Sequence, residues 1–453
     1  MHTILLPVTS ARKSRRHPVS HALVTMAVTI VFTALPPVVT TTVAQGTPGA
    51  ASPAAAPAAP RNDYWVYVGA ESADKIYRVR FGPAGTVVEK AIAVGELAAE
   101  MEGPHGLAIS RDRKYLYMTT GHGNPDGKLW RYELGPDTLA GRGILLGNFP
   151  ASLDVTPDGL YSFSANFNLH GDMIPSTVSV VYTPTQTEVA RIVTCTMPHG
   201  SRISPDGMRQ YSTCMMDDQL VEIDPRDFAV SRRFPLAKGR EGPLAKDVGS
   251  TMAGMGDMAG MKHDMAVMSH DVGAGSGAKS AGKPATATVD PAQVGRAGMG
   301  IEKHTMAPAS CSPTWAQPSV NGDRVWVACN KADEIIEIDS KSWTLTRRLK
   351  TGRGVYNLAV TPDGRLLVAT LKPGSSIEIF DIASGRSLAQ IKTTNTLAHG
   401  ITVSSDSKYA FVSSEGVGAA PGKVDVFDLV AFAKVGTADV GQQASGIAFW
   451  KMN

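Results

Sequence analysis

The sequence lacks the signatures of several common classes of protein. Its 453 residues contain no Gly-x-Ser-x-Gly nucleophile motif, no phosphate-binding P-loop and no His-Glu-x-x-His metal motif. The absence of a Cys-x-x-Cys-His segment argues against a covalently attached c-type haem. The net charge is only +3, and no stripe of lysine or arginine runs through the body of the chain. We therefore expect no nucleic-acid partner.

The N-terminus has the pattern of a secretory signal. Basic residues from Arg12 to Arg16 precede an apolar run over 22–35, and small residues follow up to Ala44. This order predicts a signal peptide over 1–44, and the paired arginines leave the twin-arginine export route open. Threonine and proline interrupt the run, which is too short for a membrane anchor, so we expect no stable membrane span after cleavage.

An Ala/Pro-rich stretch over 45–61 follows the predicted signal. It has too few large apolar side chains to bury a core, and it is predicted to be a disordered spacer. The mature protein is therefore expected to be periplasmic or secreted, with its folded part beginning near residue 62.

One short pattern recurs along the chain at intervals of about 45 residues. Its clearest copy is Pro-His-Gly-Ser-Arg-Ile-Ser-Pro-Asp-Gly over 198–207, which predicts a short strand and a tight turn. A second strand follows, then a strand of alternating residues that ends in Asp, then a polar fourth strand. The positions equivalent to His199 are His105, Ala151, Thr314, Tyr356, His399 and Ser445.

These repeats predict an all-β fold, a seven-bladed propeller of four-stranded antiparallel blades over 62–453. The last repeat holds only a first strand, and the first folded segment lacks one. The C-terminal strand is therefore expected to join the N-terminal blade, which closes the ring and removes exposed strand edges. The alternative is a β-sandwich with additional domains, which the in-phase repeats disfavour. We expect a monomer.

The repeats resemble the Tyr-Val-Thr-Asn-type (YVTN) repeats of bacterial seven-bladed propellers. The Ser-Pro-Asp-Gly turn, the Tyr-Val-type second strand and the strand that ends in Ile-Asp or Phe-Asp carry the resemblance over about 62–453. Such propellers include lactonase-like proteins and domains of nitrous oxide reductase and of the haem d1 nitrite reductase. The resemblance implies the fold and leaves the activity open.

An insertion over 238–309 separates the predicted blades 4 and 5. Thioether and imidazole groups suit copper(I), so this segment is a candidate site of copper capture. Its composition resembles the Met/His-rich stretches of exported copper-resistance proteins. The alternative is a disordered insertion or a packing lid, because methionine is also an adaptable packing residue. The candidate ligands are Met252, Met255, Met258, Met261, His263, Met265, Met268 and His270.

The four cysteines fall at matching positions in blades 4 and 5. Cys214 and Cys329 end second strands, whereas Cys195 and Cys311 lie just before first strands. The end of one strand lies beside the start of its antiparallel neighbour. We therefore predict the disulfides Cys195–Cys214 and Cys311–Cys329, as expected for an exported protein. The alternative is a cysteine cluster around a metal ion.

First strands line the channel of a propeller, so His105, His199, His399 and Tyr356 are predicted to meet at one channel mouth as a ligand-binding site. Four of the seven channel positions are followed by glycine, which we expect to leave room near the axis. Imidazoles in this place suit a transition metal, a haem or an anion. The alternative is that each histidine only binds backbone at the start of its strand.

Two functions remain open from the sequence. The first is an exported, non-enzymatic binding protein or scaffold for a protein or small-molecule ligand, with copper as a candidate ion. The second is an enzyme that uses the channel histidines, either a lactonase-like hydrolase or a copper- or haem-linked oxidoreductase. No catalytic residue and no definite cofactor are assigned, and the sequence favours the binding protein.

Overall fold

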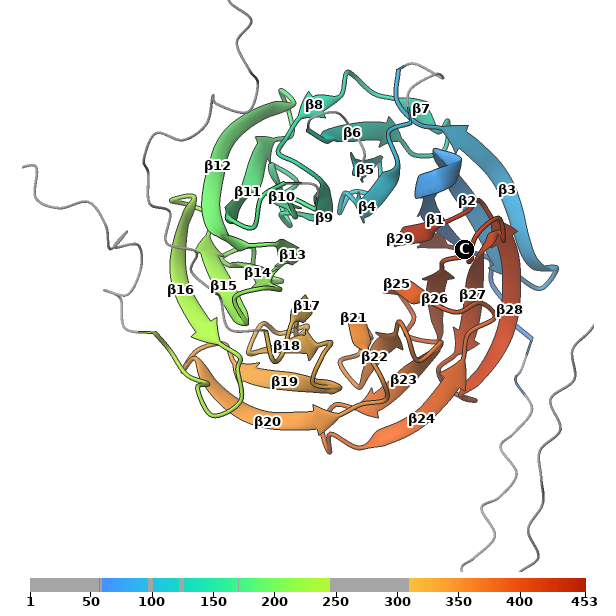
Figure 1. Cartoon of the computed structure of the whole chain (residues 1–453). Coiled ribbons are helices and arrows are strands. Elements are labelled where there is room, and N and C mark those ends of the chain that lie inside the picture. Colours follow the sequence, from blue (N-terminus) through green and yellow to red (C-terminus); the bar gives the residue numbers. More distant parts are fainter. Residues whose placement is uncertain (1–56, 58, 97–100, 122–125, 170, 245–308) are drawn as a thin grey trace, which may run out of the picture. The chain divides into compact units, whose positions relative to one another are not determined.

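The computed structural model describes residues 57, 59–96, 101–121, 126–169, 171–244 and 309–453, and these form a seven-bladed β-propeller (Figure 1). Each blade is a sheet of four antiparallel strands, and in blade 2 a short fifth strand, β8, pairs with β6. The described residues contain one short 3-10 helix, η1 (Glu71–Ala73). The predicted fold class is confirmed, and the β-sandwich is excluded.

The strands follow the predicted order, from the channel outward within each blade. Blade 1 contains β29 (Ala444–Met452), β1 (Tyr64–Ala70), β2 (Lys75–Gly82) and β3 (Gly85–Ala93). Blade 2 contains β4 (Pro104–Ile109), β5 (Tyr115–Thr120), β6 (Lys128–Glu133), β7 (Thr138–Leu139) and β8 (Ile144–Leu145). Blade 3 contains β9 (Pro150–Val155), β10 (Tyr161–Asn166), β11 (Pro175–Tyr182) and β12 (Thr187–Thr196). Blades 4 and 5 contain β13 (Pro198–Ile203), β14 (Gln210–Cys214), β15 (Gln219–Asp224) and β16 (Ala229–Pro235); and β17 (Pro313–Pro318), β18 (Arg324–Cys329), β19 (Glu334–Asp339) and β20 (Thr344–Lys350). Blades 6 and 7 contain β21 (Val355–Val360), β22 (Leu366–Leu371), β23 (Ser376–Asp381) and β24 (Ser387–Lys392); and β25 (Ala398–Val403), β26 (Tyr409–Ser414), β27 (Gly422–Asp428) and β28 (Ala433–Val440).

The C-terminal strand closes the ring, as predicted. β29 pairs antiparallel with β1, with Ile447 opposite Val68 and Ala448 opposite Tyr67. It supplies the innermost strand of blade 1, whose other strands come from the N-terminal part of the propeller. The pairing ties residues more than 370 positions apart, such as Tyr64 and Met452, and leaves blade 1 complete.

The core is divided among the seven interfaces between neighbouring blades. Each interface holds its own cluster of buried apolar side chains. Between blades 7 and 1, for example, Val66 packs with Phe411 and Val426, all fully buried. Because the middle strands of a blade contact neighbours on both faces, they read as almost continuous apolar runs, and their alternation is weaker than in a half-exposed sheet.

The recurring turn is explained by its own hydrogen bonds. In blade 4 the Ser204 hydroxyl donates to the Asp206 carboxylate and accepts the backbone N–H of Arg209. Gly207 has a φ of 71°, which favours glycine because a Cβ is strained there. The Ser-Pro-Asp-Gly sequence is thus a structural signature of the first hairpin in the blade.

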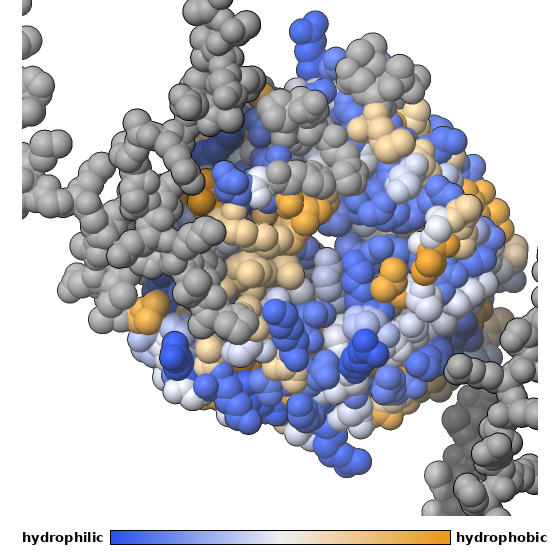
Figure 2. Space-filling model, viewed as in Figure 1, coloured by the Kyte–Doolittle hydropathy of each residue, from blue (hydrophilic) through white to orange (hydrophobic). Residues whose placement is uncertain are grey.

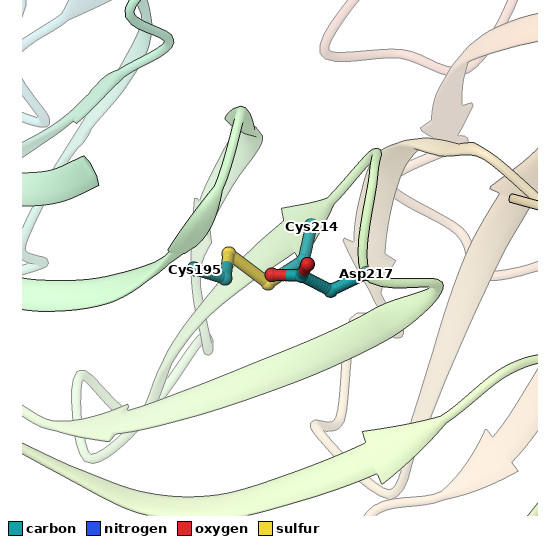
Figure 3. A group of neighbouring side chains, drawn as sticks. All are labelled: Cys195, Cys214 and Asp217. Carbon is teal, nitrogen blue, oxygen red and sulfur yellow. A yellow bond between two sulfur atoms is a disulfide. The ribbon is translucent and has the colours of Figure 1, made fainter. Parts of the chain in front are cut away.

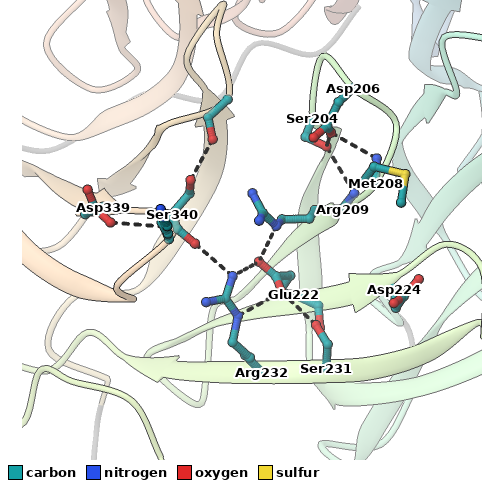
Figure 4. A network of polar contacts seen from close by, with 12 residues as sticks. Ser204, Asp206, Met208, Arg209, Glu222, Asp224, Ser231, Arg232, Asp339 and Ser340 are labelled. Carbon is teal, nitrogen blue, oxygen red and sulfur yellow. Dashed lines mark hydrogen bonds and ion pairs between the residues drawn. The ribbon is translucent and has the colours of Figure 1, made fainter.

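Acidic residues in the third strands tie blades together. In blade 4 the buried Glu222 accepts hydrogen bonds from Ser231 and Arg232 (Figure 4). Arg232 Nη2 also donates to the carbonyl of Ser340 in blade 5, 2.9 Å away. Blade 5 repeats the arrangement, because Glu337 binds Arg347, which reaches the next blade. These charges therefore have a structural role.

Both predicted disulfides are present. Cys195 and Cys214 join the start and the end of the first hairpin in blade 4, with their Cα atoms 5.8 Å apart. Cys311 and Cys329 do the same in blade 5, at 4.5 Å. No free cysteine is left in the described residues or elsewhere in the sequence.

Removing either disulfide should lower stability measurably. The bridges close loops with sequence separations of 19 and 18, and loops of this length contribute about 3 kcal/mol by restricting the unfolded chain. We expect the double variant Cys311→Ser/Cys329→Ser to unfold at lower urea concentration than the oxidised wild type. Adding a reductant should lower the unfolding midpoint of the wild type by more than that of this variant, because the wild type has two disulfides to lose. Equal midpoints for variant and wild type would contradict the prediction.

Among the described residues, no helix has the length and apolar character needed to cross a membrane. The predicted signal peptide, most of the predicted spacer and positions 245–308 of the predicted insertion lie outside the described residues. These boundaries remain predictions.

Candidate functional site

The seven channel positions are structurally equivalent. Each is the second residue of the innermost strand of its blade, and these strands surround the centre of the ring (Figure 1). His105, His199 and His399 are all buried. The His105 ring contacts the His399 ring, and the Tyr356 ring contacts those of His199 and His399.

Six aromatic side chains make a closed circuit of contacts at this mouth, which we call the aromatic ring. His105 contacts His399, with ring centroids 5.3 Å apart, and His399 contacts Tyr356 at 4.9 Å. Tyr356 contacts His199 at 5.6 Å. Phe167 and Phe149 complete the circuit back to His105. Most of these contacts are edge-to-face or tilted, the geometries that aromatic quadrupoles favour.

His105 is paired with a buried carboxylate. Its Nδ1 lies 2.5 Å from Glu71 Oε1, and the side chains are 8% and 3% exposed. An ionised carboxylate only accepts hydrogen bonds, so Nδ1 carries a proton in this contact, and Nε2 is the ring nitrogen that has a lone pair in the neutral form. Glu71 is held in turn by Gln443, whose Nε2 donates to the other carboxylate oxygen at 3.1 Å. A histidine oriented in this way by a carboxylate is suited to act as a general base.

His199 has a fixed tautomer as well. Its Nδ1 lies 2.7 Å from the carbonyl oxygen of Thr314, so Nδ1 must donate. Burial, followed by the charge of His105, lowers the pKa of His199 to about 3, so the ring is neutral at neutral pH. Its Nε2 therefore accepts a hydrogen bond from the Tyr356 hydroxyl group, 3.1 Å away. The Tyr356 oxygen keeps its lone pairs for an incoming donor.

A lysine supplies positive charge beside Tyr356 and His399. Lys372 Nζ lies 2.6 Å from Glu415 Oε1 and 4.6 Å from the centroid of Tyr356. Burial opposes the charge on Lys372, but Tyr356 and Glu415 outweigh it and raise its pKa. Burial and the charge of Lys372 together lower the pKa of His399. The site thus holds one ammonium group beside His199 and His399, whose lowered pKa values keep their imidazoles neutral.

These histidines should make the fold sensitive to acid. A folded pKa of about 3 for His199, against 6.5 when unfolded, means that only the unfolded chain takes up a proton between these values. The contribution of His199 to the free energy of unfolding is therefore present above pH 6.5. It is lost as the pH drops, and the loss from His199 alone is about 2 kcal/mol at pH 5. His199→Gln should remove part of this pH dependence in urea unfolding. Tyr356→Phe should keep it, because burial is the main cause. An unchanged slope in His199→Gln would contradict this assignment.

The mouth is built by two further repeated positions that the sequence analysis did not single out. In each blade the residue after the second strand donates its backbone N–H to the residue two places before the channel position. The acceptor residue always has a left-handed φ, between 48° and 69°. The seven donor–acceptor pairs are Glu71–Gln443, Gly121–Gly103, Phe167–Phe149, Met215–Met197, Asn330–Ser312, Lys372–Gly354 and Glu415–Leu397.

These positions divide the mouth into two halves of different chemistry. Blades 6, 7 and 1 contribute the charged residues Lys372, Glu415 and Glu71. Blades 3 and 4 contribute Phe149, Phe167, Met197 and Met215, which pack together as one apolar cluster. Apolar surface accordingly gathers left of the central opening in Figure 2, over blades 3 and 4. A ligand at this mouth meets an apolar wall on one side and charged groups on the other.

The glycines after the channel positions serve a purpose that differs from the predicted one. A Cβ on Gly200 would lie 2.7 Å from Trp315 Cα in the next blade, and one on Gly400 would lie 2.5 Å from Ser445 O. These distances are shorter than side chains tolerate. The glycines allow neighbouring first strands to approach each other, and the expectation that they leave room near the axis was wrong.

The described residues contain little that is already arranged as a set of metal ligands. The one group whose donor atoms lie within 4.8 Å of one another is Cys195, Cys214 and Asp217 (Figure 3). Its sulfurs form a disulfide and offer no thiolate, and Asp217 accepts the backbone N–H of Thr196. The donor atoms of the three channel histidines do not converge this closely.

The Met/His-rich candidate copper ligands lie outside the described residues. Copper capture by this insertion therefore remains a prediction, and copper(I) titration of the protein with and without residues 250–272 is the way to decide it.

No family model matches the chain, and no curated protein matches it. Solved structures do share its fold. A Lactobacillus plantarum protein has a TM-score of 0.58 at 13% identity, covering 86% of this chain and 100% of its own. The periplasmic gluconolactonase of Pseudomonas aeruginosa has 0.57 at 15%, covering 86% and 99%. A putative 6-phosphogluconolactonase from Bacteroides fragilis has 0.54 at 14%, covering 86% and 98%. This chain thus has the seven-bladed propeller fold found in lactonase-like proteins, and membership of the YVTN repeat family is not established.

Proposed function

We propose that this protein is an exported hydrolase of small cyclic esters, with its active site at the channel mouth. The observation that carries the proposal is the buried His105–Glu71 pair beside the aromatic ring, with the ammonium group of Lys372 in the same charged half of the mouth. Burying charged groups costs stability unless they are paired. A cluster of this kind in a channel is therefore a candidate for chemistry.

The residues present fit each step of lactone hydrolysis. His105 Nε2 takes a proton from a water molecule while the water oxygen attacks the ester carbonyl carbon. The carbonyl π bond opens to an oxyanion, and Lys372 supplies the nearby positive charge that stabilises it. The carbonyl then re-forms, the ring C–O bond breaks, and the leaving oxygen takes the proton back from His105. The product is a hydroxy acid.

The fold comparisons support testing this chemistry first, because two of the similar structures carry lactonase names. At 14–15% identity they share the fold with this chain, and the argument for the activity rests on the site itself. The non-enzymatic binding function that the sequence favours remains the alternative. It predicts that ligands bind at the mouth without turnover.

The two halves of the mouth suggest a preference among lactones. The cluster of Phe149, Phe167, Met197 and Met215 suits an aryl or alkyl substituent, whereas a sugar lactone would place hydroxyl groups against it. We expect measurable hydrolysis of dihydrocoumarin or an alkyl-substituted γ-lactone, with kcat/KM roughly tenfold above that for glucono-δ-lactone. Proton release in weakly buffered solution measures both rates. A preference for glucono-δ-lactone would overturn the substrate preference, and no hydrolysis of any lactone would overturn the proposed activity.

Export is proposed on two grounds. The N-terminal pattern predicts a cleaved signal, and the described propeller holds two disulfides, which persist in oxidising compartments. The intact mass of the protein recovered from its native compartment tests this, because cleavage near Ala44 predicts a chain that starts close to residue 45. A chain that keeps residues 1–44 would overturn it.

A further inference from the structure

At the end opposite the aromatic ring, the channel holds a larger cavity, which we call the chamber. This cavity has a volume of about 370 Å³ and is lined by the innermost strands of all seven blades. Apolar residues such as Ile203, Val360, Ile401 and Phe449 contribute to its lining, but polar atoms make up most of the surface that faces the cavity. A cavity of this size that combines polar and apolar groups has room for a small molecule.

One cation projects into this part of the channel. Arg202 lines both the chamber and the small cavity beneath the aromatic ring. Its guanidinium carbon lies 4.5 Å from the centroid of Trp315, which holds the planar group by stacking. Among the ion pairs of the described residues, none joins Arg202 to a carboxylate, and the hydrogen bonds it makes there are two long ones from Nη1 to backbone carbonyls.

The nearest acidic group, Asp154, is already used by the backbone. Its Oδ2 accepts the N–H of Ile203 at 2.9 Å, and its Oδ1 accepts the N–H of Val155. Burial lowers the pKa of Arg202, and the charge of Asp154 opposes this shift. A partly exposed guanidinium that lines a cavity and has no direct anionic partner is available to bind an anionic ligand.

Two unsatisfied polar atoms lie next to Arg202. Within the described residues, Trp315 Nε1 and Asn357 Oδ1 are buried without a hydrogen-bond partner, and both residues line the small cavity that Arg202 shares. Buried polar atoms in native proteins are almost always satisfied. Their position beside Arg202 indicates that this section of the channel is built to hold a polar group.

We propose that the chamber is a binding site for a small organic carboxylate, with Arg202 as its anchor. A carboxylate matches the planar donor geometry of guanidinium. The apolar side chains among the lining residues can contact an aliphatic or aromatic body, and Asp154 repels a second negative charge. The expected ligand is therefore a monoanion. This site lies at the far end of the channel from the proposed hydrolase site and does not depend on that activity.

Calorimetric titration with benzoate tests the proposal. Benzoate should bind with one site per chain, roughly tenfold more tightly than benzamide, which has the same shape without the charge, and more tightly than inorganic phosphate. Arg202→Gln should weaken benzoate binding by about tenfold or more, whereas Arg202→Lys should lose less. Glu222→Gln should bind benzoate normally, because Glu222 lines neither the chamber nor the small cavity.

A variant with the opposite expected effect keeps the test independent of folding defects. Asp154→Asn removes the repelling charge and should tighten binding, more for phosphate than for benzoate. Failure of benzoate to saturate, equal affinity for benzamide, tighter binding of phosphate than benzoate in the wild type, or unchanged affinity in either Arg202→Gln or Asp154→Asn would each overturn the proposal.

Discussion

Glu71→Gln should reduce kcat for lactone hydrolysis by about two to four orders of magnitude while the propeller stays folded. Glutamine has nearly the same shape as glutamate. It offers an amide N–H as well as a carbonyl oxygen, and it no longer requires the proton to be on His105 Nδ1. Part of the enzyme then presents a protonated Nε2, which cannot accept a proton from water. The negative charge that stabilises the imidazolium is also lost.

The effect should appear mainly in kcat. Glu71 is 2% exposed and lies beneath His105, so it contributes little direct contact to a bound substrate. An interaction realised in the transition state lowers kcat and leaves KM nearly unchanged when it is lost. A change confined to KM would indicate that the pair only shapes the mouth.

Glu222→Gln is the matched control. Glu222 is also a buried glutamate, but its partners are Ser231 and Arg232 in the network between blades. Its loss should lower the unfolding midpoint and leave kcat unchanged. Equal loss of activity in both variants would show that the Glu71 effect comes from general destabilisation, and would remove this support for the catalytic pair.

Removing 443–453 should prevent the propeller from folding to a stable monomer. The deletion takes away β29, the innermost strand of blade 1. It exposes the edge of β1 and takes Ala444 and Ile447 out of the core between blades 7 and 1. It also removes the Ser445 hydroxyl, which donates to the carbonyl of Pro104 in blade 2. Open strand edges promote aggregation, so we expect insoluble protein or oligomers.

A shorter deletion tests whether the effect comes from opening the ring of blades or from shortening the chain. Removal of Asn453 alone takes one exposed residue beyond β29 and leaves every β29 pairing in place. This variant should stay monomeric by light scattering, with an unfolding midpoint close to that of the wild type. A stable, monomeric chain without 443–453 would show that the ring does not need its closing strand.

The repeats predict the fold well because every blade has the same strand order and packs against its neighbours in the same way. The two disulfides follow from the same frame, since Cys214 and Cys329 end equivalent strands. The equivalent places of His105, His199 and His399 in their innermost strands also follow from this frame. Residues outside the repeat, such as the Met/His-rich insertion, have no such frame.

The partners of the histidines do not follow from the repeat pattern alone. Glu71, Lys372 and Glu415 follow the second strands of blades 1, 6 and 7 and occupy one repeat position. That signal is present in the sequence, but each residue alone resembles an ordinary polar loop residue. Which charged group reaches which histidine depends on side-chain distances across blades, such as the 2.5 Å between Glu71 and His105, and repeat spacing does not determine these.

The most direct test of the proposed active site is chemical rescue of His105→Gly. Truncation to glycine removes the imidazole and leaves a space between Glu71, Phe149 and His399 that free imidazole can fill. The proposal predicts that the variant hydrolyses dihydrocoumarin at least about 100-fold more slowly than the wild type, and that added imidazole restores part of the rate in a saturable way. A variant as active as the wild type, or one whose rate imidazole does not raise above the uncatalysed background, would contradict the assignment of His105 as the base.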